Sequence, residues 1–269
     1  MTRKGAQVVS FGGRGFLNQN LLNHGLLNQN PVSPARSVLA VVAHPDDESF
    51  GLGAVLDLLT TAGVRCGVLC FTRGEASTLH AGAGHLAEAR SAEFAAAAAV
   101  LRLDHADLLG YPDGGLSAVP LAELTGRVLQ AARETAPGHL LTFDVGGVTG
   151  HPDHARATEA ALAAAEVLDI PVLGWTLPEA VTRMLNTEFG AAFTGRDRSE
   201  IDETLSVDRA GQRRAIGCHA SQSTANPVLW RRLELLGNEE HLRLLFAGSP
   251  QGRRDSPEIS GEVRMETRK

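Results

Sequence analysis

The chain alternates short apolar runs with amphipathic or alanine-rich segments, and this alternation constrains the fold more than any other feature. Short apolar runs are typical of buried strands, whereas apolar residues three and four positions apart are typical of one helix face. The predicted strands cover residues 37–43, 65–72, 106–109, 139–143 and 171–176. The predicted helices cover residues 50–61, 86–101, 121–134, 153–167 and 178–185. Strands and helices in this order predict an α/β fold, three-layered and Rossmann-like, with a mainly parallel sheet and helices on both faces.

The two ends of the chain differ from this central region. Residues 1–35 form a predicted low-complexity N-terminal arm, because FLNQN, LLNHG and LLNQN recur with a period that fits neither a helix face nor a strand face. The α/β domain is predicted over residues 36–248, and residues 249–269 form a polar C-terminal tail. Late in the domain, residues 209–219 and 228–236 have helical patterns, and the segment HLRLLF is expected to be an edge strand.

Composition excludes several classes of partner. A net charge of −6 and an aromatic content of 4% disfavour a nucleic-acid-binding surface. No run reaches the roughly 18 apolar residues that a membrane helix needs, and the apolar part of the N-terminus is too short for a signal-peptide core. The chain has only three cysteines, and so small and uneven a number does not indicate a disulfide framework. We therefore expect a cytoplasmic protein with no nucleic-acid or membrane partner.

Two similar stretches carry the chemistry of the chain. HPDDE begins at His44, directly after the first predicted strand, and HPDH begins at His151, after the predicted strand 139–143. Proline is favoured at the first helical position and acids in the first turn, so both stretches are predicted helix starts. Because the carboxyl ends of parallel strands lie at one edge of a sheet, we expect the two stretches to meet there.

The residue types in these stretches are those of a metal site. His44 and Asp47 are three positions apart, as are His151 and His154, so each pair shares one face of a first turn. Two imidazoles and one carboxylate, with a position left for water, form a catalytic zinc site, and the same donors suit iron(II). Asp46 and Asp47 point in different directions, so that one can bind the ion while the other serves as a general base. Taken alone, either stretch could instead be an ordinary capped helix start that binds no metal.

AHPDDE followed by HPDH resembles the PIG-L/LmbE-like family of zinc-dependent N-acetylglucosaminyl deacetylases. The similarity extends over roughly residues 37–246 and includes FTRGE, ARSAEFAAAAAVL, YPDGGL and CHASQ. The resemblance implies that the zinc ligands are His44, Asp47 and His154. It also implies that Asp46 is the general base.

The resemblance assigns three further residues. It implies that His151 steadies the oxyanion or protonates the leaving amine, and that Arg90 and Asp113 contact sugar hydroxyls. Taken from the residues alone, Arg90 could instead pair on the surface with Glu88 or Glu93, and Asp113 could be an ordinary turn residue.

Two late assignments stay open at this point. His219 in CHASQ is interpreted as a buried core histidine, with a contribution to the site as the alternative. Glu75 is either a carboxylate that orients a metal ligand or a solvated loop residue.

The function that the resemblance implies is removal of the acetyl group from a small N-acetylglucosamine-type conjugate, with zinc, or iron(II), as cofactor. The alternative on the same scaffold is a metal-dependent amidase that acts on another acyl-amine, such as a thiol conjugate. A nucleotide-binding module is disfavoured because HPDDE stands where such folds carry G-x-G-x-x-G. A homo-oligomer is compatible with the resemblance, but no spacing in the sequence requires one.

Overall fold

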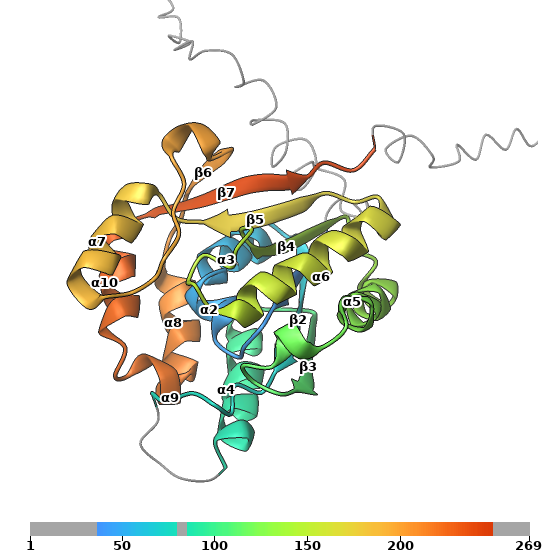
Figure 1. Cartoon of the computed structure of the whole chain (residues 1–269), viewed down its shortest axis with the longest axis horizontal. Coiled ribbons are helices and arrows are strands. Elements are labelled where there is room, and N and C mark those ends of the chain that lie inside the picture. Colours follow the sequence, from blue (N-terminus) through green and yellow to red (C-terminus); the bar gives the residue numbers. More distant parts are fainter. Residues whose placement is uncertain (1–36, 80–84, 250–269) are drawn as a thin grey trace, which may run out of the picture.

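A seven-stranded sheet runs through the part of the chain that the computed structural model describes, residues 37–79 and 85–249 (Figure 1). The spatial order of its strands is β3-β2-β1-β4-β5-β7-β6. The strands are β1 (Ser37–Val42), β2 (Arg65–Thr72), β3 (His105–Tyr111), β4 (His139–Phe143), β5 (Val172–Thr176), β6 (Glu203–Ser206) and β7 (Glu239–Phe246). The first five pair in parallel, and β7 pairs antiparallel with both β5 and β6, which confirms the predicted α/β class with a mainly parallel sheet. The predicted arm and the tail after Ser249 lie outside the described residues.

Strand β1 occupies the centre of the parallel part of the sheet, between β2 and β4. Val38 lies opposite Cys66 on one side and His139 on the other, and every residue of β1 is buried. Parallel strands that are covered on both faces read as continuous apolar runs, which is why SVLAVV was recognisable from the sequence. Cys66 is buried and has a free thiol, as expected for a small core residue.

Helices cover both faces of the sheet (Figure 1). They are α2 (Asp47–Phe50), α3 (Gly53–Thr61), α4 (Leu86–Val100), α5 (Leu121–Thr135), α6 (Pro152–Leu168), α7 (Glu179–Phe189), α8 (Ala210–Cys218), α9 (Ala220–Ser223) and α10 (Pro227–Leu236), with short 3₁₀ turns at Leu116–Ala118 and Arg198–Glu200. None of these described helices has both the length and the apolar character needed to cross a membrane.

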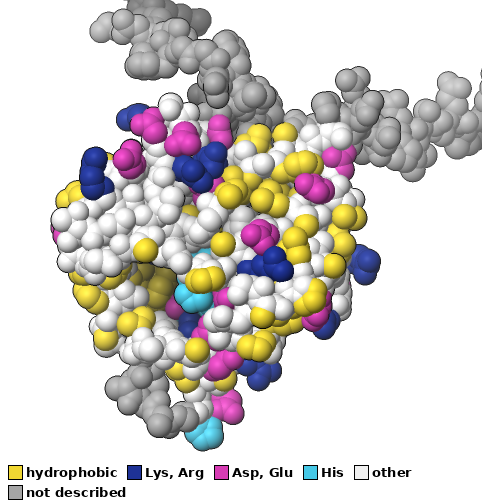
Figure 2. Space-filling view, in the orientation of Figure 1, with side chains coloured by type: hydrophobic (Ala, Val, Ile, Leu, Met, Phe, Trp, Pro, Cys, Tyr) yellow, Lys and Arg dark blue, Asp and Glu magenta, His cyan; other side chains and the backbone are white. Residues whose placement is uncertain are grey.

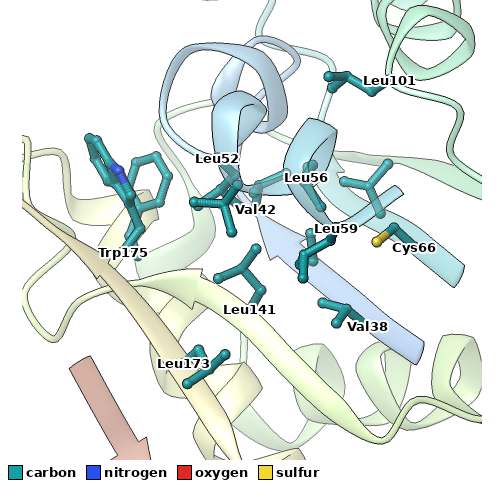
Figure 3. Close-up of a cluster of buried hydrophobic side chains, with 14 of the residues drawn as sticks. Val38, Val42, Leu52, Leu56, Leu59, Cys66, Leu101, Leu141, Leu173 and Trp175 are labelled. Atoms are coloured by element: carbon teal, nitrogen blue, oxygen red, sulfur yellow. The ribbon is translucent and has the colours of Figure 1, made fainter. Parts of the chain in front are cut away.

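Alternate side chains of β1 pack in two separate hydrophobic cores, one on each face of the sheet. Val38 and Val42 belong to the core beneath α3, together with Leu56 and Leu59 (Figure 3). Leu39 belongs to the opposite core, beneath α5 and α6. Beyond its first turn, the buried face of α6 consists mainly of alanine, which allows that helix to pack closely on the sheet. A strand whose successive side chains point to opposite faces produces this division.

Three features differ from the sequence expectations. The segment HLRLLF is not an edge strand, because β7 pairs with both β5 and β6. Strand β6 was missed because ETLS is half exposed and contains a single apolar residue. The expected helix 50–61 is interrupted at Gly51, where an added Cβ would lie 2.6 Å from the Phe143 ring.

The two His-Pro-Asp stretches also begin their helices differently. HPDH follows the expected pattern, with His151 as N-cap and Pro152 as the first helical residue. In HPDDE the helix starts only at Asp47, and Asp46 before it has a φ of 125°. His44 therefore precedes the helix. From the sequence we expected it in the first helical turn, and that prediction was wrong.

Candidate metal centre

The carboxyl ends of β1 and β4 carry the site, because these strands are parallel neighbours. His44 follows β1, while His151 and His154 come from the start of α6, after the loop that leaves β4. The two stretches therefore meet, although more than a hundred residues separate them in the sequence.

Three donor atoms converge at this edge of the sheet. Nδ1 of His44 lies 3.0 Å from Nε2 of His154, which lies 3.1 Å from Oδ1 of Asp47. The second Asp47 oxygen is 3.7 Å from His44 Nδ1. Tetrahedral zinc bonds of about 2.0–2.1 Å place neighbouring donors roughly 3.3 Å apart, so this spacing fits one ion. The three side chains are also candidates by mutual distance and are all buried.

The outer nitrogen of each of the two imidazoles lies close to an oxygen atom. His44 Nε2 lies 3.0 Å from Asp113 Oδ1 and 3.5 Å from Asp153 Oδ2. His154 Nδ1 lies 2.7 Å from the Thr149 hydroxyl. Metal-bound histidines usually donate their second ring nitrogen to such an oxygen, which sets the tautomer. The free nitrogens of the two rings therefore face each other across the proposed ion position.

The electrostatics of the cluster favour a cation. Burial opposes the charged imidazole, yet the contacts with Asp113 and Asp153 and the charge of Asp47 raise the pKa of His44 to about 10. Burial also opposes ionised Asp47, but His154 and His44 hold its pKa well below the usual range. The site thus concentrates negative charge around two imidazoles, and a divalent cation would neutralise it.

Asp46 lies next to this donor set without belonging to it. Its Oδ2 accepts a hydrogen bond of 2.9 Å from Arg90, and its backbone N–H donates to Glu48 Oε2 at 2.9 Å. Burial raises its pKa, Arg90 lowers it, and the result is a pKa of about 6. A non-ligand carboxylate with a pKa near neutrality is suited to general-base chemistry.

The backbone of Asp46 is held from the opposite side by a buried ion pair. Glu48 and His219 are both fully buried, and His219 Nε2 lies 2.6 Å from Glu48 Oε1. The interpretation of His219 as a core histidine is confirmed, and through Glu48 it also supports the strained backbone of Asp46. Sequence reasoning missed Glu48, although a third consecutive acid beside a core strand was a signal.

Arg90 is not the surface residue of the alternative interpretation. It is 3% exposed, donates to the carbonyl oxygens of Gly74 and Pro45, and binds Asp46. Gly74 has a φ of +64°, and an added Cβ there would lie 2.0 Å from the Arg90 guanidinium. Arg90 contacts Asp46 directly and also lines the cavity. Its contact with a sugar hydroxyl stays a prediction.

Asp113 is connected to the metal donors as well as to the cavity. Its Oδ1 faces His44, and its Oδ2 accepts a hydrogen bond of 2.8 Å from the Ala76 N–H. The Glu75 carboxylate accepts the Asp113 N–H at 3.0 Å, so Glu75 supports the loop rather than a donor. The contact of Asp113 with a sugar hydroxyl stays a prediction.

Asp153, which sequence reasoning did not single out, is fully buried under His44. Its carboxylate accepts the backbone N–H groups of Gly114 and Leu116 at 2.8 and 3.1 Å. It thereby links α6 to the YPDGG loop that carries Asp113. The place of Asp153 as the third residue of HPDH was the one signal for this role in the sequence.

His151 completes the cluster. Its ring centroid lies 4.6 Å from that of His44, and its Nδ1 accepts the Asp153 N–H at 3.2 Å. A neutral ring with an accepting Nδ1 carries its proton on Nε2. Burial and the neighbouring His44 and His154 lower the pKa of His151.

A cavity of about 610 Å³ opens above the donor atoms. Figure 2 shows this hollow, with histidine and hydrophobic side chains at its margin. One wall is apolar and contains Phe50, Phe143, Phe193, Val228 and Leu229; the polar lining includes Ser77, Gln222 and Asn226. The volume accommodates a small glycoside over the donor atoms.

Comparison with known proteins identifies relatives for most of the domain. The family model "PIG-L: GlcNAc-PI de-N-acetylase" matches residues 39–165. A Salinispora arenicola protein named 1D-myo-inositol 2-acetamido-2-deoxy-α-D-glucopyranoside deacetylase is 30% identical over 229 residues, 71% of this chain and 74% of its own length. A Nakamurella multipartita protein of the same name is 30% identical over 81% of this chain and 91% of its own length. The match to the Kineococcus radiotolerans protein of that name, 34% identical, spans 48% of this chain and only 44% of that relative.

Solved structures share the fold at lower identity. The N,N′-diacetylchitobiose deacetylase from Pyrococcus horikoshii has a TM-score of 0.58 and 20% identity, covering 89% of this chain and 94% of its own. The hydratase GalB from Pseudomonas putida has a TM-score of 0.60 and 18% identity, covering 85% and 99%. Because a hydratase shares this fold, the fold alone does not determine the reaction. The family model and the two relatives aligned over most of their own length show that this chain belongs to the PIG-L family.

Proposed function

We propose that this chain is a metal-dependent N-deacetylase that hydrolyses the acetamide of a small N-acetylglucosamine conjugate, releasing acetate and the free amine. The observation that carries the proposal is the buried donor set of His44, Asp47 and His154, with Asp46 and His151 beside it, at the base of one cavity. The names of the relatives support the amino-sugar substrate over the alternative amidase.

The donor set fits zinc, and iron(II) suits the same residues. A cation held there polarises the amide carbonyl and lowers the pKa of a water molecule. The protein contributes three oriented donors and a largely buried surrounding, in which charge interactions are stronger than in water.

Asp46 is the proposed general base. Its carboxylate is close to the donor atoms but directed to Arg90, so it remains free of the donor set. It accepts the proton of the attacking water. Loss of such a base typically lowers the rate by about 10²–10⁴.

His151 is the proposed proton donor. Its Nδ1 is occupied by the Asp153 N–H, so Nε2 carries the proton toward the cavity. Hydrolysis adds hydroxide to the acetyl carbon and a proton to the departing nitrogen. The Nε2–H group stabilises the oxyanion or protonates that nitrogen, and loss of one such donor costs about 10²–10³ in rate.

Metal analysis and acetate release on the same purified protein test this proposal. We expect about one zinc or iron per chain and release of acetate from the N-acetylglucosaminyl inositol. Asp46→Asn should keep the metal and lose most turnover, whereas Asp107→Asn, a carboxylate outside the cavity lining, should keep both. Full turnover of Asp46→Asn would remove that residue from the mechanism, and a metal-free wild type with full activity would refute the proposal.

A further inference from the structure

The cavity contains a second arginine whose charge the proposed reaction does not use. Arg232 lies on α10 and lines the same cavity as the metal donors. It is 6% exposed and lies on the buried face of the helix, between Leu229 and Leu236. A charge among the apolar positions of a helix requires a physical explanation.

Among the described residues, the contacts of Arg232 include no direct ion pair. Its Nη2 donates to the Phe50 carbonyl at 2.6 Å, and its guanidinium lies 5.2 Å from the centre of the Trp175 ring. Its Nε is buried and has no hydrogen-bond partner in the described part of the chain. Within residues 37–79 and 85–249, no carboxylate forms an ion pair with this guanidinium.

The neighbouring buried acid, Glu240, is already occupied. Its Oε1 pairs with Arg209 at 2.5 Å, and its Oε2 accepts the Trp175 indole N–H at 2.7 Å. Burial lowers the pKa of Arg232 to about 10; the positive charge of Arg209 adds to this effect, whereas the negative charges of Glu240, Asp47 and Asp46 oppose it. The guanidinium nonetheless stays protonated at neutral pH.

Arg90 is the other cation of the cavity, and its situation is different. Arg90 is paired with Asp46 and bonded to two carbonyl groups. Arg232 therefore has no direct ion pair among the described residues, and Glu240, Asp47 and Asp46 attract its charge only at longer range. Its neighbours in the cavity include Phe50 and Leu229, and an apolar surrounding strengthens any ion pair formed there.

A buried, unpaired charge is unfavourable unless a partner arrives. Guanidinium groups match the two oxygens of a carboxylate or phosphate better than any other group does. We propose that Arg232 forms an anion-binding subsite in this cavity, so that the preferred substrate carries a carboxylate or phosphate in addition to its acetamide. This inference rests on the proposed deacetylase function, whose substrate it narrows.

With this subsite, the preferred substrate of this chain would differ from the substrate for which its relatives are named. The Salinispora and Nakamurella proteins are named for an inositol glycoside that has no ionised group. An anionic conjugate would gain from Arg232, whereas that neutral glycoside would leave the guanidinium unpaired.

A pair of ligands of equal length isolates the effect of the charge. We would measure dissociation constants of the 2-carboxyethyl and 3-hydroxypropyl glycosides of N-acetylglucosamine, by calorimetry, in an Asp46→Asn background that binds without turnover. The carboxylate ligand should bind more tightly. Arg232→Met should weaken its binding by about 10–100-fold and change binding of the hydroxypropyl ligand by less than about twofold.

Two variants control for damage to the fold. Arg232→Lys keeps the charge and should retain part of the preference for the carboxylate ligand. Arg231→Met removes the same charge from the adjacent position, where Arg231 pairs with Glu188 and Glu234, and should leave both dissociation constants unchanged. If Arg232 had only a structural role, Arg232→Met would weaken the binding of both ligands equally, and that result would overturn the proposal.

Further ligands locate the anion on the substrate. A 2-phosphoethyl glycoside tests phosphate against carboxylate, and an N-succinyl glucosamine tests whether the anion belongs to the acyl group. Wild-type preference for any charged ligand that Arg232→Met abolishes supports the subsite; absence of preference for all of them overturns it. Acetate release by the wild type from each of the N-acetyl ligands, charged and neutral, is measured separately. Its absence from all of them, with charge-dependent binding retained, refutes the proposed function alone.

Discussion

The hydroxyl of Thr149 offers a sharp test of how the donor set is held. Its Oγ1 lies 2.7 Å from His154 Nδ1, while the other nitrogen of that ring faces His44 and Asp47. Thr149→Val keeps the side-chain shape and removes this hydrogen bond, together with the one that the hydroxyl accepts from the His151 N–H at 3.3 Å. The His154 ring then loses the contact that fixes its tautomer and leaves Nδ1–H without a partner.

The size of the effect can be worked out in two ways. Loss of the outer partner of a metal-bound histidine lowers metal affinity by about 10–100-fold. A buried donor left without an acceptor costs about 1–3 kcal/mol, which corresponds to roughly the same factor. We therefore expect the dissociation constant for zinc to rise by about one to two powers of ten in Thr149→Val.

Competition with a chelating dye measures this constant directly. Thr176→Val is the matched control, because Thr176 is fully buried, its hydroxyl has no hydrogen-bond partner among the residues that the structure describes, and it does not line the cavity. That variant should bind zinc as the wild type does. Unchanged zinc affinity in Thr149→Val, with the fold intact, would refute the assignment of His154 Nε2 as a metal donor.

Further outcomes follow from other contacts. Arg90→Lys keeps a positive charge but cannot reach all three acceptors of Arg90, so we expect a roughly tenfold lower kcat with little change in KM; a large rise in KM alone would instead favour the sugar contact. Burial and Asp202 raise the pKa of Glu203 to about 7, above its ordinary 4.5. Its ionisation therefore destabilises the fold increasingly as pH rises from 4.5 to 7, and stability is unaffected below that window. Glu203→Gln should be more stable than the wild type by about 1 kcal/mol at pH 8, after allowance for partial exposure, and equal to it near pH 4; urea unfolding at both pH values measures this, and an equal difference at both would contradict it.

Much of the fold could be read from the sequence because its central strands are covered on both faces. Strands such as SVLAVV and HLLTF are continuous apolar runs with every residue buried, and these are the strands that carry the site. Strand β6 lacked this signal, since ETLS alternates between partly buried and exposed residues. Without β6, the adjacent β7 was expected at an edge.

The site was readable where chemistry depends on local spacing. His44, Asp47 and His154 lie in or just before helix starts that the sheet topology brings together, and their donor atoms lie within reach of one ion. Thr149, Asp153 and Glu48 were not singled out, because their roles arise from contacts between segments distant in the sequence or from the path of a loop.

Arg232 is an instructive intermediate case. The helical pattern of residues 228–236 was recognised, but the position of one charge within its apolar stripe was not used. Leu229, Arg232, Leu233 and Leu236 share the buried face of α10. A cation at such a position was therefore a visible sign of a polar function inside the fold.

Anomalous diffraction at the zinc edge, from crystals of the metal-loaded protein, tests the central claim most directly. We expect one strong peak about 2.0–2.2 Å from His44 Nδ1, His154 Nε2 and an Asp47 oxygen, with Asp46 outside bonding distance. A peak at another cluster, for example His105, Asp107 and Glu134, with none at the cavity, would contradict the assignment of these three residues.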